Sequence, residues 1–141
     1  MLIFSCLIIM NEQYNCMSSI KYYKAPDVES EIFSLVNKLN LNHVDISRVV
    51  CIRSFGSKSK RTIARCHTTS KIIQASLGIG AHYIIEIISE VYDKMPQEEK
   101  IKTLIHELMH IPKSFGGGFR HHDFVNKKGV EGLYKKYLEK K

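Results

Sequence analysis

The sequence lacks the features of several protein classes, and each absence narrows what it can do. Its four cysteines form no CxxC pair, which excludes a zinc ribbon and a thioredoxin-like redox motif. Four cysteines in 141 residues do not make a disulfide scaffold either. No internal repeat or low-complexity segment is present. With 44% hydrophobic and 25% charged residues, the composition is that of one globular domain.

The N-terminus is apolar but resembles neither a membrane span nor a signal peptide. The run MLIFSCLIIM is too short to cross a bilayer, and it has no basic region before it and no small-residue cleavage site. We therefore expect a cytoplasmic protein with no membrane partner. From Met17 the composition becomes typically globular. We predict that residues 1–16 are a disordered or mis-called extension, with translation starting at Met1 or Met17, and that residues 17–141 form the domain.

Positive charge is in excess and unevenly spread. The formal net charge is +7, and no aspartate or glutamate occurs between Ile46 and Ile85. The cations of that stretch and of the C-terminal tail are Arg48, Arg53, Lys58, Lys60, Arg61, Arg65, Lys71, Lys135, Lys136, Lys140 and Lys141. Such a distribution is typical of a solvated surface, or of a patch that attracts nucleic acid weakly.

The hydrophobic periodicity predicts an α+β domain. A helix with Asp27 as its N-cap is followed by two strands, a short helix, a strand, a helix, a loop and a last helix. The expected ranges are 27–39, 48–54, 61–67, 70–77, 82–91, 96–111 and 123–138. We expect the first two strands to form a hairpin in which Cys51 and Cys66 face each other, as buried thiols or as a disulfide.

The segment HELMH, residues 106–110, carries the chemistry. On a helix, His106 and His110 lie one turn apart on the same face, so both imidazoles can bind one zinc ion. Glu107 lies beside them, where it can take a proton from a metal-bound water. This is the zincin arrangement of a metallopeptidase. The same helix has an apolar stripe formed by Ile101, Leu104, Ile105 and Leu108, so one side can be buried while the histidines face a cleft.

The third metal ligand is open among three residues. The metzincin pattern HExxHxxGxxH fails because positions 113 and 116 are Lys113 and Gly116. His122, at the entrance to the last helix, is the first choice. Neighbouring His121 is the second choice. Adjacent residues of an extended chain point in opposite directions, so we expect only one of the two histidines to bind the metal. Glu131 on the last helix is the third.

The run HELMHIPKSFGGGFRHHDF resembles the signature HELxHIPxxFxGGxRxH of a small family of archaeal and phage metallopeptidases with a zincin-like fold. The segments KYYKAPDV, SRVVCIRS and ARCH also look like family members, so the resemblance covers nearly everything from Met17 onward. It implies a single zincin-like domain with a short mixed sheet, an HExxH helix and a C-terminal helix. It also implies metal binding by His106, His110 and His122, with catalysis by Glu107.

The predicted function is that of a zinc metallopeptidase with one Zn²⁺ ion, acting on a peptide or protein substrate. We expect strand 82–90 either to line the substrate groove and pair with an extended peptide, or to be an ordinary sheet strand. One alternative function is a basic nucleic-acid-associated protein that keeps the metal for folding. A second alternative is a SprT-like protease that acts on DNA-bound proteins.

Overall fold

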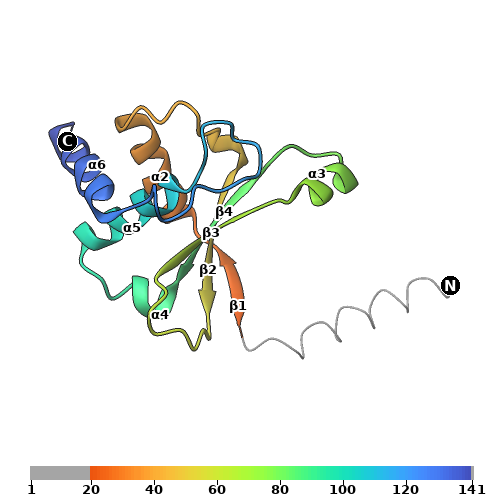
Figure 1. Cartoon of the computed structure of the whole chain (residues 1–141). Helices are drawn as coiled ribbons and strands as arrows, with labels where there is room; N and C mark the ends of the chain where they lie inside the picture. Colours follow the sequence, from red (N-terminus) through yellow and green to blue (C-terminus); the bar gives the residue numbers. More distant parts are fainter. Residues whose placement is uncertain (1–19, 141) are drawn as a thin grey trace.

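Four strands form one mixed sheet in the computed structural model, which describes residues 20–140 (Figure 1). The strands are β1 (Lys21–Lys24), β2 (Val49–Phe55), β3 (Ala64–Thr68) and β4 (Tyr83–Ile88). Their order across the sheet is β1-β2-β4-β3. The β2–β4 pair is parallel, and the two outer pairs are antiparallel.

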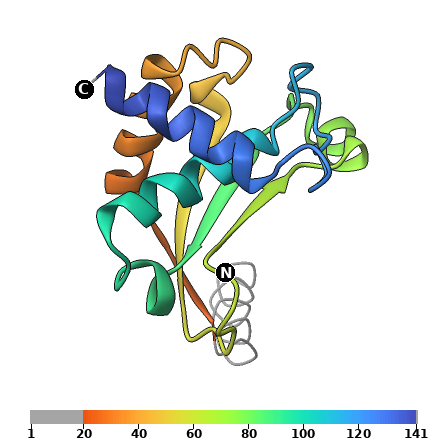
Figure 2. The same cartoon turned by 60° about the vertical axis from the view of Figure 1, so that its left-hand side comes forward.

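Within residues 20–140, five helices accompany the sheet. They are α2 (Pro26–Lys38), α3 (Lys71–Leu77), α4 (Ser89–Tyr92), α5 (Gln97–Met109) and α6 (Lys127–Glu139), and a 3₁₀ turn spans Ile46–Arg48. Helices α2, α5 and α6 gather on one side of the sheet, and α3 lies at its far end (Figure 1). Helix α6 packs on α5, with the sheet behind them (Figure 2). The predicted α+β class, with a short mixed sheet and a C-terminal helix, is confirmed.

The predicted hairpin between the first two strands is wrong. Strand β4 lies between β2 and β3 and pairs with both. Five of its six residues are buried, and a strand covered on both faces has such a nearly continuous apolar run. The most apolar strand, β4, therefore lies inside the sheet. Strand β3, which alternates between half-buried and exposed residues, lies at an edge.

This topology also separates the two cysteines. Cys51 and Cys66 both lie opposite Ile85, on either side of β4. Adjacent strands are about 4.8 Å apart, so the two Cα atoms are about 10 Å apart, beyond the reach of a disulfide. Both cysteines are free thiols.

The core fills the space between the sheet and α2, α5 and α6. Its largest fully buried side chains include Ile32 and Leu35 of α2, Ile85 of β4, and Leu104 and Leu108 of α5. Each such side chain contributes roughly 1.5–3 kcal/mol through burial. The apolar stripe expected on the HELMH helix is therefore the surface that fixes α5 against the sheet.

Two predicted helix starts are corrected. Asp27 is not the N-cap of α2, because Ala25 is the cap and Pro26 opens the first turn, where Asp27 lies. Helix α6 begins at Lys127 rather than Asp123, since the Asn126 side chain accepts the Gly129 backbone N–H and caps it there. The prediction for residues 1–16 lies outside the described residues. Within residues 20–140, no helix is both long and apolar enough to cross a membrane.

Candidate metal centre

Helix α5 carries two of the three histidines that meet at the centre. Pro96 precedes the first turn, and Glu98 and Glu99 lie in it, where carboxylates favour the positive end of a helix. Because the apolar stripe faces the core, the opposite face presents His106 and His110 to a cleft. His106 lies in the last turn of α5, and His110 is the C-cap of the helix, one turn later. Their relative position is therefore set by one turn of helix.

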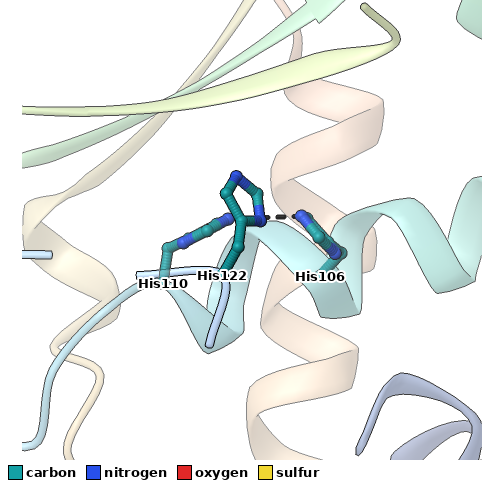
Figure 3. A group of neighbouring side chains, drawn as sticks. All are labelled: His106, His110 and His122. Atoms are coloured by element: carbon teal, nitrogen blue, oxygen red, sulfur yellow. Dashed lines mark hydrogen bonds between the residues drawn. The ribbon is translucent and has the colours of Figure 1, made fainter. Parts of the chain in front are cut away.

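His122 comes from the loop between α5 and α6 and completes a group of three imidazoles (Figure 3). One ligand nitrogen from each of His106, His110 and His122 lies within 4.8 Å of the others. The ring centroids are 4.9 Å apart for His106 and His110, 5.5 Å for His106 and His122, and 4.9 Å for His110 and His122. Three residues from two segments thus converge on one point.

The geometry of this group fits a zinc ion. Two nitrogens bound tetrahedrally at about 2.0–2.1 Å from zinc are about 3.3 Å apart, and the Nε2 atoms of His106 and His110 are 3.2 Å apart. Nδ1 of His110 donates to the backbone oxygen of Arg120 at 2.7 Å. This bond protonates Nδ1 and leaves Nε2 as the free lone pair, as metal-ligating histidines require.

The protonation state of His106 also suits a ligand. Burial, and then the charges that His110 and His122 can carry, lower the pKa of His106 below its ordinary value. The neutral form of imidazole is the one that binds metal ions. Burial of His106 beside the other two imidazoles thus favours the state in which His106 coordinates.

Glu107 lies on the same helix and lines the same cleft. Only 6% of its surface is exposed. Burial raises its pKa to about 7, although the backbone N–H of Cys66 on β3 donates to the carboxylate and opposes that rise. A carboxyl group poised near neutrality can both accept and release a proton, which is what a general base and acid needs.

The other two candidate ligands lie apart from this group. His121 is exposed and lines the cleft, but it is not part of the three-nitrogen cluster. Glu131 pairs with Lys102 of α5 at 2.8 Å, and that hydrogen bond lowers the pKa of Glu131. Its carboxylate therefore serves the contact between α5 and α6.

The cleft between β3, α5, α6 and the loop has a volume of about 930 Å³. Of the two roles expected for strand 82–90, lining the cleft is wrong and an ordinary sheet strand is confirmed. That strand is β4, whose two edges are already paired with β2 and β3. The strand that borders the cleft is β3, one of the two edge strands of the sheet.

One buried carboxylate near the cleft was not predicted from the sequence. Glu86 of β4 is 5% exposed and accepts a hydrogen bond from His67 of β3 at 2.8 Å. Burial opposes its ionisation, but this bond and the nearby Arg65 hold the pKa of Glu86 below its ordinary value. The signal that could have found it is a single acid in the apolar run YIIEII, because lone buried acids are rare unless paired.

Ion pairs neutralise part of the acid-free stretch. Three of its arginines pair with acids that lie outside the stretch, one of them, Asp45, immediately before it. The pairs are Arg48–Asp45 at 2.7 Å, Arg53–Asp27 at 2.6 Å and Arg65–Glu86 at 3.5 Å. The local excess of positive charge is therefore smaller than the sequence indicates.

One of three comparisons with known proteins found a match. A family model described as "Putative phage metallopeptidase" matches residues 20–139. That range includes the whole sheet and all three histidines of the cluster. Searches of curated proteins and of solved structures found no match.

Proposed function

Since the chain belongs to the phage metallopeptidase family, we propose that it is a zinc-dependent peptidase with its metal held by His106, His110 and His122. The observation that carries the proposal is the convergence of three imidazole nitrogens within 4.8 Å. The bond from His110 Nδ1 to the Arg120 carbonyl adds support, because it orients the free nitrogen toward the other two.

Glu107 is the proposed general base. A zinc ion at the three histidines would lower the pKa of a bound water and polarise a substrate carbonyl. Glu107 accepts the proton of the attacking water and later delivers it to the leaving amine. Its burial keeps the carboxyl group away from bulk water, and the Cys66 N–H holds it against β3.

The shape of the cleft favours a peptide or protein substrate. Strand β3 has one edge unpaired in the sheet and borders the cleft. Backbone bonds link Thr69 N–H to the His82 carbonyl and Ile88 N–H to the Ile63 carbonyl, so odd-numbered β3 residues face β4. Ala64, Cys66 and Thr68 then turn their backbone groups outward, with the Cys66 N–H already donated to Glu107. An extended peptide can pair with such an edge.

The metal assignment is tested by zinc analysis of purified protein. Wild type should bind one zinc ion per chain. His110→Ala should lose it, and so should His122→Ala, because a catalytic zinc normally needs three protein ligands. Loss in His110→Ala alone would contradict the assignment of His122.

The role of Glu107 is tested separately by Glu107→Gln. This variant should keep its zinc and lose hydrolysis of any peptide or protein that wild type cleaves, since glutamine cannot accept the proton. Glu131→Gln, which changes a carboxylate of the same cleft that pairs with Lys102, is the matched control and should stay active. Wild-type rates in Glu107→Gln would refute the mechanism.

A nucleic-acid-associated role is the second candidate, either with a structural metal or as a SprT-like protease. Four cations of the acid-free stretch favour it, because Lys58, Lys60, Arg61 and Lys71 form no ion pair within residues 20–140. Binding to single- and double-stranded DNA at low and moderate salt tests it, since phosphate contacts weaken steeply with salt. No binding at low salt would remove this class.

A further inference from the structure

The loop between α5 and α6 has to bring the third histidine back to the other two. Residues 111–126 contain no helix or strand, and glycines 116–118 lie in the middle of them. Glycine loses more conformational freedom on ordering than any other residue. A loop that was ordered only by metal binding would spend part of the binding free energy on that ordering. Contacts that hold the loop in place before the metal binds therefore raise the metal affinity of the site.

The distal end of the loop is fixed by α5 itself. Arg120 N–H donates to the His110 carbonyl at 2.8 Å, and His110 Nδ1 donates to the Arg120 carbonyl at 2.7 Å. These two bonds hold the backbone two residues before His122. They leave the glycine segment without a partner from α5.

Tyr83 of the central strand β4 holds the glycine segment. Its side chain is fully buried. The hydroxyl accepts the Gly117 N–H at 3.1 Å and donates to the Gly118 carbonyl at 2.9 Å. Both hydrogen-bonding roles of one phenol are thus used on two consecutive residues of the loop.

The surroundings of Tyr83 fix its ring and the loop together. Phe115 and Phe119, which bracket the glycines, contact the Tyr83 ring with centroids 4.8 and 6.3 Å away. Gly117 has φ +94°, and a Cβ there would lie 2.9 Å from the Thr69 carbonyl oxygen. The loop can therefore approach the backbone at the end of β3 this closely only because that position is glycine.

We propose that Tyr83 is a positioning residue for the metal centre. Its hydroxyl holds the triglycine loop in the conformation that places His122 beside His106 and His110. It touches none of the three imidazoles, so it acts through His122. This inference rests on the metal-binding part of the proposed function and does not depend on the peptidase step.

The test is Tyr83→Phe, which keeps the ring and its contacts but removes both hydrogen bonds to the loop. Zinc affinity, measured by competition with a chromophoric chelator, should fall by about 10-fold or more, as for other residues that orient metal ligands. Amide exchange should be faster across residues 115–122 in the zinc-free variant. Tyr137→Phe is the matched control. It removes a buried tyrosine's hydroxyl bond to Glu31 at 3.2 Å, away from the loop, and should leave zinc affinity and loop exchange unchanged.

A double-mutant cycle separates positioning from general destabilisation. In a His122→Ala background, the weak residual affinity of the His106–His110 pair, measured at zinc concentrations high enough to fill it, should not fall further with Tyr83→Phe, because the effect of Tyr83 runs through His122. An equal loss with and without His122, or wild-type affinity in Tyr83→Phe, would overturn the role of Tyr83. A wild-type chain that binds no zinc would instead overturn the proposed function, and the role of Tyr83 with it.

Discussion

Replacing Glu107 with glutamine should stabilise the zinc-free protein at alkaline pH. Burial raises the Glu107 pKa from an ordinary 4.5 to about 7 in the folded protein. Between these values the folded protein keeps a proton that the unfolded chain has released. The stabilisation from the protonated group is therefore fully present below about pH 4.5 and is lost as the pH rises through 7. Glutamine has no such loss.

The size of the effect follows from the gap between the two pKa values. At about 1.4 kcal/mol for each pH unit, the gap is worth about 3 kcal/mol. Integration over pH gives an advantage for the variant of about 1 kcal/mol at pH 5 and about 3 kcal/mol at pH 9. Because Glu107 is only 6% exposed, solvent screening removes little of it. The carboxylate proposed as the general base thus lowers the stability of the fold at the pH where it ionises.

Urea denaturation in the presence of a chelator measures this, with unfolding followed by circular dichroism at pH 5, 7 and 9. Glu131→Gln is the control with the opposite sign. The hydrogen bond from Lys102 lowers the Glu131 pKa, so its ionised form stabilises the fold above the ordinary value and the variant should be less stable at pH 9. A stability difference between Glu107→Gln and wild type that did not change with pH would refute the reasoning.

Three further predictions concern the ligands, the loop and the core. His121→Ala should keep its zinc and His122→Ala should lose it in metal analysis; the reverse result would assign the site to His121. Gly117→Ala should weaken zinc binding, because its φ of +94° and the close Thr69 carbonyl leave no room for a Cβ, whereas Gly118, with open space around it, should tolerate alanine. Equal zinc affinities in the two variants would contradict this account of the loop. Leu104→Ala should lower the free energy of unfolding by about 2–5 kcal/mol without changing zinc stoichiometry, since Leu104 is fully buried in the core away from the cleft. A smaller loss in urea denaturation would mean that the core can collapse around the missing side chain.

Local patterns were sufficient for most of the elements. The short helix before Gly78 was predicted because a glycine stops it, and Gly78 does adopt the left-handed conformation there. Helix α5 was predicted from its apolar stripe, its acidic first turn and the proline after it. Strand β1 was missed, since KYYK is short and exposed and has no alternation that separates it from a loop.

Strand pairing was beyond local patterns. Strands close in sequence usually pair, and that rule predicted the hairpin of β2 and β3. The apolar run of β4 was visible in the sequence, but its meaning as a central strand depends on which elements cover both faces. Only the assembled sheet shows β4 between the other two, and with it which strand borders the cleft.

The HELMH pentapeptide by itself determined the relation between His106, Glu107 and His110. One helical turn sets the distance between i and i+4, whatever surrounds the helix. Tertiary structure brings His122, the first choice among the three candidates, to them and decides how buried the proposed base is. His122 reaches the pair because a loop is held by Tyr83, 39 positions earlier in the chain, and Glu107 is poised near neutrality because the folded chain buries it. Both depend on contacts between segments far apart in the sequence, which no local pattern specifies.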